Sequence, residues 1–152
     1  MLSQTTEYAL RLVVQLAGQR GAPATIPELA RSTRIPEGYL AKVLRQLSRA
    51  GLVRSQRGPN GGSVLARDPE EVSVLDVVQA VDPLKRIETC PLGLRGHGAN
   101  LCPLHRRLDQ AIASVEAAFR ASSLAEIVGD PAATRPLCED PRRRRGAIGG
   151  RR

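Results

Sequence analysis

Two of the three cysteines and both histidines of the chain lie close together in the sequence. In order they are Cys90, His97, Cys102 and His105. Thiolates and imidazoles are preferred protein ligands of zinc and iron–sulfur clusters. The chain is expected to reside in the cytoplasm, where cysteines serve metal or redox chemistry more often than structural disulfides. This stretch therefore predicts a metal or redox site.

Several interpretations of this stretch stay open on the residues alone. Zinc could bind all four side chains, but Cys-x6-His-x4-Cys-x2-His is not a common zinc spacing. The thiols could instead be redox-active, or idle. Cys138, in the C-terminal tail, is either free or a late ligand.

The stretch from Thr25 to Ala66 must form the framework around this site. Thr25 and Glu28 have the spacing of a capping box and predict the start of a first helix. A second helix is predicted over Pro36–Ala50, because its apolar residues recur at helical spacing. Gly51 is suited to end that helix in a left-handed conformation.

A glycine-rich turn after the second helix predicts a hairpin. Four of the six residues from Arg57 to Gly62 are Gly or Pro, and Asn60-Gly61 favours positive φ. Two helices followed by such a hairpin are typical of a winged helix-turn-helix, a DNA-binding element. Candidate DNA contacts lie on the exposed helix face and on the wing: Tyr39, Lys42, Arg45, Gln46, Arg49, Arg54, Arg57, Gly58, Asn60 and Gly61.

Composition agrees with a nucleic-acid partner. The net charge of +8 favours a polyanion, and the 2% aromatic content predicts an aliphatic, mainly helical core. No stretch reaches the roughly 20 apolar residues that a membrane span needs. The first 20 residues predict a helix and not a signal peptide. No nucleophile–base pair, paired acids or nucleotide-binding loop is found, so an enzyme is not expected.

The remaining chain predicts four segments. Residues 1–83 form the winged helix-turn-helix domain, including a first helix over 5–19 and a helix capped by Ser73. Residues 84–103 form the cysteine loop. Residues 104–128 form a long dimerisation helix and a short terminal helix, and the apolar steps of the long helix approach a heptad seam. That seam contains Leu104, Leu108, Ile112, Val115 and Phe119. Residues 129–152 form a basic tail expected to be disordered.

The chain resembles the bacterial winged helix-turn-helix regulators of the IscR/NsrR/CymR type, from Thr5 to about Val128. The resemblance is carried by EYALRLVVQLA, IPEGYLAKVLRQLSRAGLV, RSQRGPNGGSVLAR, VSVLDVVQAVD and CPLG…LCPLH. It implies a homodimer that binds a roughly palindromic operator. The helix face would then enter the major groove, and the wing would reach a minor groove. Ala41 stands where the cluster regulator has an acidic base-reading residue, so operator preference does not transfer.

The same resemblance implies a place in the iron–sulfur branch with an altered ligand set. Cys90, Cys102 and His105 match the first cysteine, third cysteine and histidine of the pattern, whereas Gly96 replaces the middle cysteine. His97, or Glu7 of the partner chain, is the candidate further ligand. Such a set suits a [2Fe-2S] cluster.

We therefore expect a homodimeric repressor whose DNA binding depends on an iron–sulfur cluster that senses redox state, nitric oxide or iron and cluster status. The alternative is the same fold without a cluster, regulated by a partner protein or by thiol redox chemistry.

Overall fold

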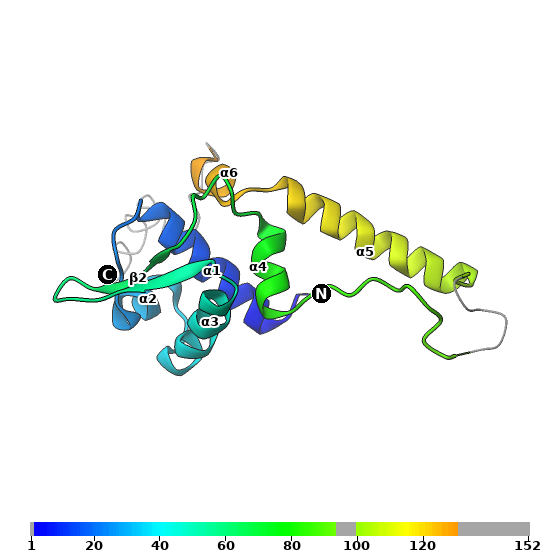
Figure 1. Cartoon of the computed structure of the whole chain (residues 1–152), viewed down its shortest axis with the longest axis horizontal. Coiled ribbons are helices and arrows are strands. Elements are labelled where there is room, and N and C mark those ends of the chain that lie inside the picture. The colour runs from blue at the N-terminus through cyan, green and yellow to red at the C-terminus, as the bar shows by residue number, and fades with distance from the viewer. Residues whose placement is uncertain (1, 94–99, 131–152) are drawn as a thin grey trace, which may run out of the picture.

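The computed structural model describes residues 2–93 and 100–130 (Figure 1). His97, Cys138 and the predicted tail of residues 129–152 lie outside this part, apart from Gly129, which belongs to a helix, and Asp130. The described residues form six helices and one antiparallel hairpin, so the mainly helical fold agrees with the sequence prediction. The elements are α1 (Gln4–Gly18), α2 (Ile26–Thr33), α3 (Glu37–Arg49), β1 (Val53–Gln56), β2 (Gly62–Leu65), α4 (Val74–Val81), α5 (Pro103–Ala121) and α6 (Leu124–Gly129).

The predicted helix ends are found where local chemistry places them. The backbone N–H of Thr25 donates to the Glu28 carboxylate at 2.8 Å, closing the capping box that begins α2. This backbone hydrogen bond is the main reason why the pKa of Glu28 is lowered. Ser73 caps α4 in the same way, through Asp76. Gly51 follows α3 with φ +71°, the left-handed conformation expected there.

Helix α1 lies at the centre of an aliphatic core. Its inner face is buried against α2, α3, α4 and α6, which together with α1 we call the body. The largest fully buried side chains are aliphatic apart from Thr6. In the core they include Leu12, Leu29, Leu40, Leu47 and Leu124. Leu40 and Leu47 belong to α3, so the apolar face of that helix is buried and its opposite face is left for solvent or a ligand.

The hairpin is fastened to the helical body by its second strand. Ser63 exchanges two backbone hydrogen bonds with Ala24, at 3.0 and 2.7 Å. A Cβ on Gly62 would lie 2.5 Å from the Ala24 carbonyl oxygen, so only glycine permits this close approach. The prediction of positive φ at Asn60-Gly61 is wrong, because the left-handed residue of the turn is Gly58, at φ +116°.

Helix α5 projects from the body, whereas α6 packs back onto it (Figure 1). None of the 19 residues of α5 is buried. In contrast, Leu124 of α6 is fully buried in the core, and its N–H donates to the carbonyl of Val72 at 2.9 Å. Residues 82–93, which we call the strap, leave the end of α4 and run alongside α5 in the opposite direction. No helix in the described part is long and apolar enough to cross a membrane.

Candidate DNA interface and cysteine site

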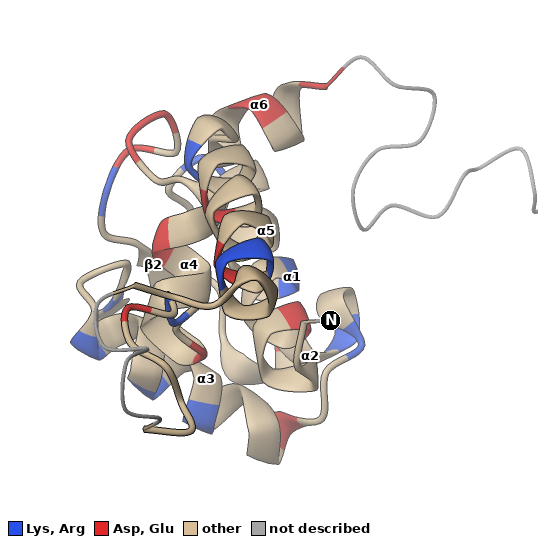
Figure 2. Ribbon diagram, turned by 90° about the vertical axis from the view of Figure 1, so that its right-hand side faces the viewer, with Lys and Arg blue, Asp and Glu red and all other residues tan. Residues whose placement is uncertain are grey.

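The outer face of α3 carries cationic side chains that are exposed to solvent. Lys42, Arg45 and Arg49 are exposed, on the face opposite to the buried leucines. Figure 2 shows Lys and Arg positions on α3, at one end of the molecule, and acidic positions on α6, at the other. A duplex approaching the α3 end would therefore meet positive charge without crossing the acidic end.

Two residues predicted to contact DNA are also engaged by the protein. Tyr39 is 47% exposed and packs edge-to-face on Tyr8 of α1, with ring centroids 5.7 Å apart. Gln46 turns toward α4 instead. Its Nε2 donates a long 3.5 Å hydrogen bond to the carbonyl of Val81, and its Oε1 is buried. Tyr39 therefore keeps an accessible surface, whereas Gln46 is half-buried where α3 meets α4.

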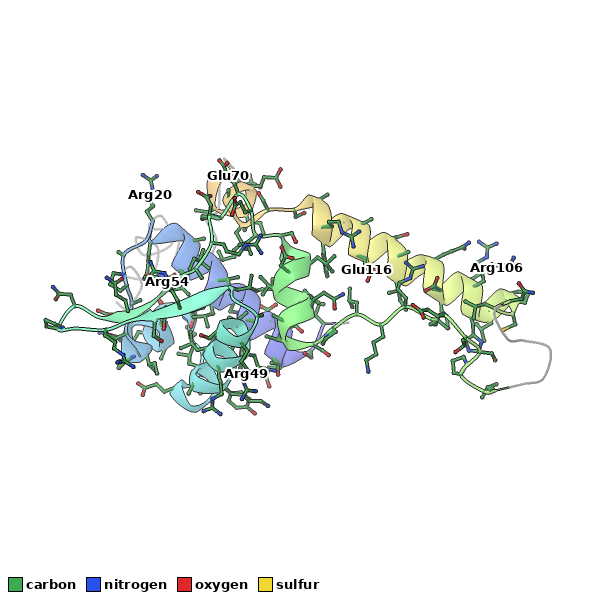
Figure 3. The ribbon with its side chains drawn as sticks, in the orientation of Figure 1. Arg20, Arg49, Arg54, Glu70, Arg106 and Glu116 are labelled. Atoms are coloured by element: carbon green, nitrogen blue, oxygen red, sulfur yellow. The ribbon has the colours of Figure 1, made fainter. Side chains whose placement is uncertain are left out.

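The wing extends the cationic surface beyond α3. Arg54 on β1 and Arg57 at its end are exposed, as are Gly58 and Asn60, while Gly61 is half-buried. Figure 3 shows Arg49 on α3 and Arg54 on the hairpin. A pocket of about 310 Å³ separates α3 from the hairpin, with Arg45 among its lining residues. Helix and wing together thus form a basic surface that is hollowed between them.

The structure brings Cys102 and His105 into contact at the start of α5. Cys102 is the N-cap residue, and its Sγ lies 3.3 Å from Nδ1 of His105. Cys90, at the end of the strap, is buried, with 8% of its surface exposed. In the described ranges no disulfide involves Cys90 or Cys102, and no group of three Cys, His, Asp or Glu is arranged to hold a metal. Within the described residues, Cys102 and His105 therefore form a Cys–His pair, and Cys90 does not join them in a group that could hold a metal.

A bidentate ion pair fastens the strap to α5 near this site. Nε and Nη2 of Arg86 donate to the two carboxylate oxygens of Asp109 at 2.6 and 2.5 Å. The backbone N–H of Ile87 also donates to Asp109, at 2.9 Å, and Glu116 lies 3.6 Å from Arg86. The Arg86 hydrogen bonds, followed by that of Ile87, lower the pKa of Asp109 to about 2. Nothing in the sequence pattern indicated this pair, because its members are 23 residues apart.

Glu7 lies on α1, which is remote from the end of α5 that carries Cys102 in the same chain. It belongs to the first turn of α1, where its carboxylate accepts a 3.0 Å hydrogen bond from Nε of Arg11. Both side chains are solvent-accessible, so this ion pair contributes little stability, at most about 1 kcal/mol. The Glu7 carboxylate is therefore free to change partners at small cost.

The exposed apolar side chains of α5 define a seam that differs at two positions from the one that the sequence predicts. Leu104, Leu108 and Val115 are 63%, 47% and 41% exposed. Ile112 and Phe119 are half-buried, on the side that carries Asp109 and Glu116. Among the exposed positions of α5, five apolar ones step by 4, 3, 4 and 3 residues, which is the spacing of a coiled-coil seam. We define the α5 seam as Leu104, Leu108, Ala111, Val115 and Ala118.

Comparisons with known proteins agree with this geometry. Residues 2–130 match the family model described as "Rrf2: Iron-dependent Transcriptional regulator". A Mycobacterium tuberculosis (strain H37Rv) protein named as an HTH-type transcriptional regulator is 35% identical over 133 residues, covering 84% of this chain and 81% of its own.

Two solved structures show the same fold. One is T. potens IscR, with a TM-score of 0.72 and 24% identity, covering 86% of this chain and 87% of its own. The other is CymR, the global cysteine regulator of B. subtilis, with a TM-score of 0.71 and 24% identity, covering 85% and 96%. Both confirm the winged-helix prediction at the level of fold.

Proposed function

The chain belongs to the Rrf2 family of transcriptional regulators, whose members are not enzymes, and from this premise we propose that it is a homodimeric repressor controlled by a [2Fe-2S] cluster. The Cys102–His105 contact carries the proposal, because it lies at the exposed end of a helix that has no buried residue.

DNA binding uses the outer face of α3 and the wing. Tyr39 and Lys42 are available to the major groove, and Arg45 and Arg49 to adjacent phosphates. Arg57 and the side-chain-poor turn from Gly58 to Gly61 suit a minor groove. We assign Gln46 to holding α3 against α4, since its amide is turned inward.

The α5 seam forms the dimer contact in an antiparallel arrangement. That arrangement places Leu104 opposite the partner's Ala118, and Leu108 opposite the partner's Val115, while Ala111 lies at the dyad. Large residues then face smaller ones, as a closely packed seam requires. A parallel pairing would instead place Ala111 and Ala118 against their own copies and leave the seam underpacked there.

The antiparallel arrangement also explains how Glu7 could serve as a ligand. Helix α5 is 19 residues long, or about 28 Å at 1.5 Å per residue, so its cysteine end lies far from the body of its own chain. In an antiparallel pair, the cysteine end of one α5 approaches the body of the partner. The N-terminal end of α1, which carries Glu7, belongs to that body (Figure 1).

The donor chemistry fits an iron–sulfur cluster shared between protomers. Cys90 and Cys102 supply thiolates, His105 supplies an imidazole, and Glu7 of the partner chain or His97 supplies the fourth ligand. The described residues of a single protomer hold no group of three such donors, so Cys90 would have to approach Cys102 and His105 when a cluster binds. A bound cluster would supply redox-dependent or nitric-oxide-dependent charge and bonding at this point.

Control of DNA binding follows from where these ligands lie. The strap carries Cys90, and it begins at the end of α4, whose Val81 carbonyl contacts Gln46 of α3. A change in strap position can therefore shift α3, the helix that contacts DNA, through α4 alone. Operator half-sites are about 34–36 Å apart, so a small rotation of α3 in each protomer weakens binding.

The direct test is purification without oxygen, followed by a visible spectrum and assays of iron and acid-labile sulfide. We expect a coloured protein with equimolar iron and sulfide, and loss of colour in Cys90→Ala, Cys102→Ala and His105→Ala. His97→Ala and Glu7→Gln identify the fourth ligand, and Glu70→Gln is the matched carboxylate control on the body. A colourless wild-type protein under these conditions would refute the cluster.

Heterodimers test whether Glu7 acts across the dimer. One chain carries Glu7→Ala and the other carries Cys102→Ala. If the ligand comes from the partner, one of the two sites keeps all its ligands, and half of the wild-type iron is retained. If the ligand comes from the same chain, both sites are defective and no iron is retained.

A second candidate function is thiol-based control without a cluster. It is favoured by Cys102, which combines partial exposure, an N-cap position and an imidazole at 3.3 Å. A colourless protein whose DNA affinity changes with oxidant, and no longer does so in Cys102→Ser, would select this function.

A further inference from the structure

The ion pair between Arg86 and Asp109 lies outside the ligand set, yet it joins the two segments that carry the ligands. Asp109 is on α5, seven residues after Cys102. Ile87, whose N–H it accepts, is on the strap, three residues before Cys90. Both carboxylate oxygens of Asp109 are used, so this single side chain fixes the strap in position and direction.

The distance from Asp109 to Cys102 along α5 is similar to the distance from Ile87 to Cys90 along the strap. Along α5, seven residues span about 10 Å at 1.5 Å per residue. Along an extended strap, three residues span at most about 11 Å. The strap and α5 run in opposite directions (Figure 1), so both distances lead toward the same end of α5. Both segments therefore lead from the ion pair toward the end of α5 that carries Cys102, and His105 lies between Asp109 and Cys102 in the sequence.

We propose that Arg86 and Asp109 are positioning residues for the cysteine site, which set the register of Cys90 against Cys102 and His105. This inference deepens the proposed function and rests on it where cluster retention is concerned. A strap that slipped by one residue would move Cys90 by about 3.3 Å, more than metal–ligand distances tolerate. The ion pair makes no contact with the ligand atoms and acts only through the strap.

The register can be measured without any cluster. Nitroxide labels on Thr89→Cys and Arg106→Cys, both exposed positions beside the ligands, report the strap-to-α5 distance in a full-length background with all native cysteines changed to Ser. Dilution with unlabelled protein removes distances between protomers. We expect Arg86→Met and Asp109→Asn to broaden the distribution by about 3 Å, one residue of slippage. Lys85→Met, which removes the same charge one position earlier, should leave it narrow.

Cluster retention provides the second measurement, in protein with its native cysteines. Iron loss on exposure to a chelator should be on the order of tenfold faster in Arg86→Met than in Lys85→Met, as for other residues that orient metal ligands. Arg86→Lys keeps the charge without the bidentate geometry and should fall between them. Thermal unfolding of the same variants is measured alongside, so that a loss of stability from the missing ion pair is separated from a change of register.

The outcomes distinguish this inference from the function on which it rests. A narrow distance distribution in both Arg86→Met and Asp109→Asn would overturn the register proposal, whatever the iron content. A wild-type protein without iron or sulfide would overturn the cluster, while the label distances would still decide the register.

Discussion

Replacing Leu108 by alanine tests the α5 seam most directly. Burying a whole leucine side chain contributes about 1.5–3 kcal/mol. Leu108 is 47% exposed in the protomer, so covering the remainder contributes about 0.7–1.4 kcal/mol per chain. A dimer contains two copies, and alanine keeps only the first carbon of the side chain. We expect the free energy of dimerisation to weaken by about 1–2 kcal/mol, or about 5- to 30-fold in dimer Kd.

Sedimentation equilibrium over a concentration range that spans the Kd measures this change. Ile112→Ala is the matched control, because Ile112 lies one turn away but is half-buried on the strap side. It should leave the dimer Kd within about twofold, since it removes no surface from the seam. If Ile112→Ala weakened the dimer as much as Leu108→Ala, the seam inferred from exposure would be wrong. The seam predicted from apolar spacing alone would then be preferred.

Three further predictions concern DNA binding, the core and the ion pair. Arg49→Ala should lower operator affinity at every sequence and reduce the slope of log K against log salt by about 2 per dimer, whereas Arg20→Asn should not, as read by fluorescence anisotropy. Leu124→Ala should lower the free energy of unfolding by about 2–5 kcal/mol, measured in urea, because the side chain is fully buried. The pKa of Asp109, about 2 in the wild type, should rise toward its ordinary 3.8 in Arg86→Met, followed by carboxyl NMR. Since the folded-state pKa is depressed, the ion pair stabilises above pH 3.8, and its contribution is lost as the pH falls toward 2.

Local signals predicted most of the winged-helix body. Capping boxes, helical periodicity and a terminal glycine act within a few residues, so the ends of α2, α3 and α4 could be placed from sequence. The hairpin was predicted from its glycines, but the left-handed residue was misplaced. Gly61 is needed for close approach instead, because a Cβ there would lie 2.4 Å from the carbonyl oxygen of Gln56.

Long-range contacts could not be predicted in the same way. Helix α6 has only six residues, and nothing in its sequence shows that Leu124 completes a core begun 112 residues earlier by Leu12. The inward turn of Gln46 depends on where α4 packs, which local periodicity does not encode. Ile112 and Leu108 are equally apolar, and only the presence of the strap separates the face that packs internally from the face left exposed.

The proposed cysteine site and the α5 seam together predict that iron binding depends on dimerisation. The cysteine end of α5 projects away from its own body, so a ligand on α1 can reach it only from the partner. Iron content should then follow the fraction of dimer, and Leu108→Ala should lose iron on dilution although it changes no ligand. His105→Ala should lose iron while remaining dimeric, because His105 lies outside the α5 seam. If iron stayed bound to monomeric Leu108→Ala, the site would be complete within one chain, and Glu7 would have no part in it.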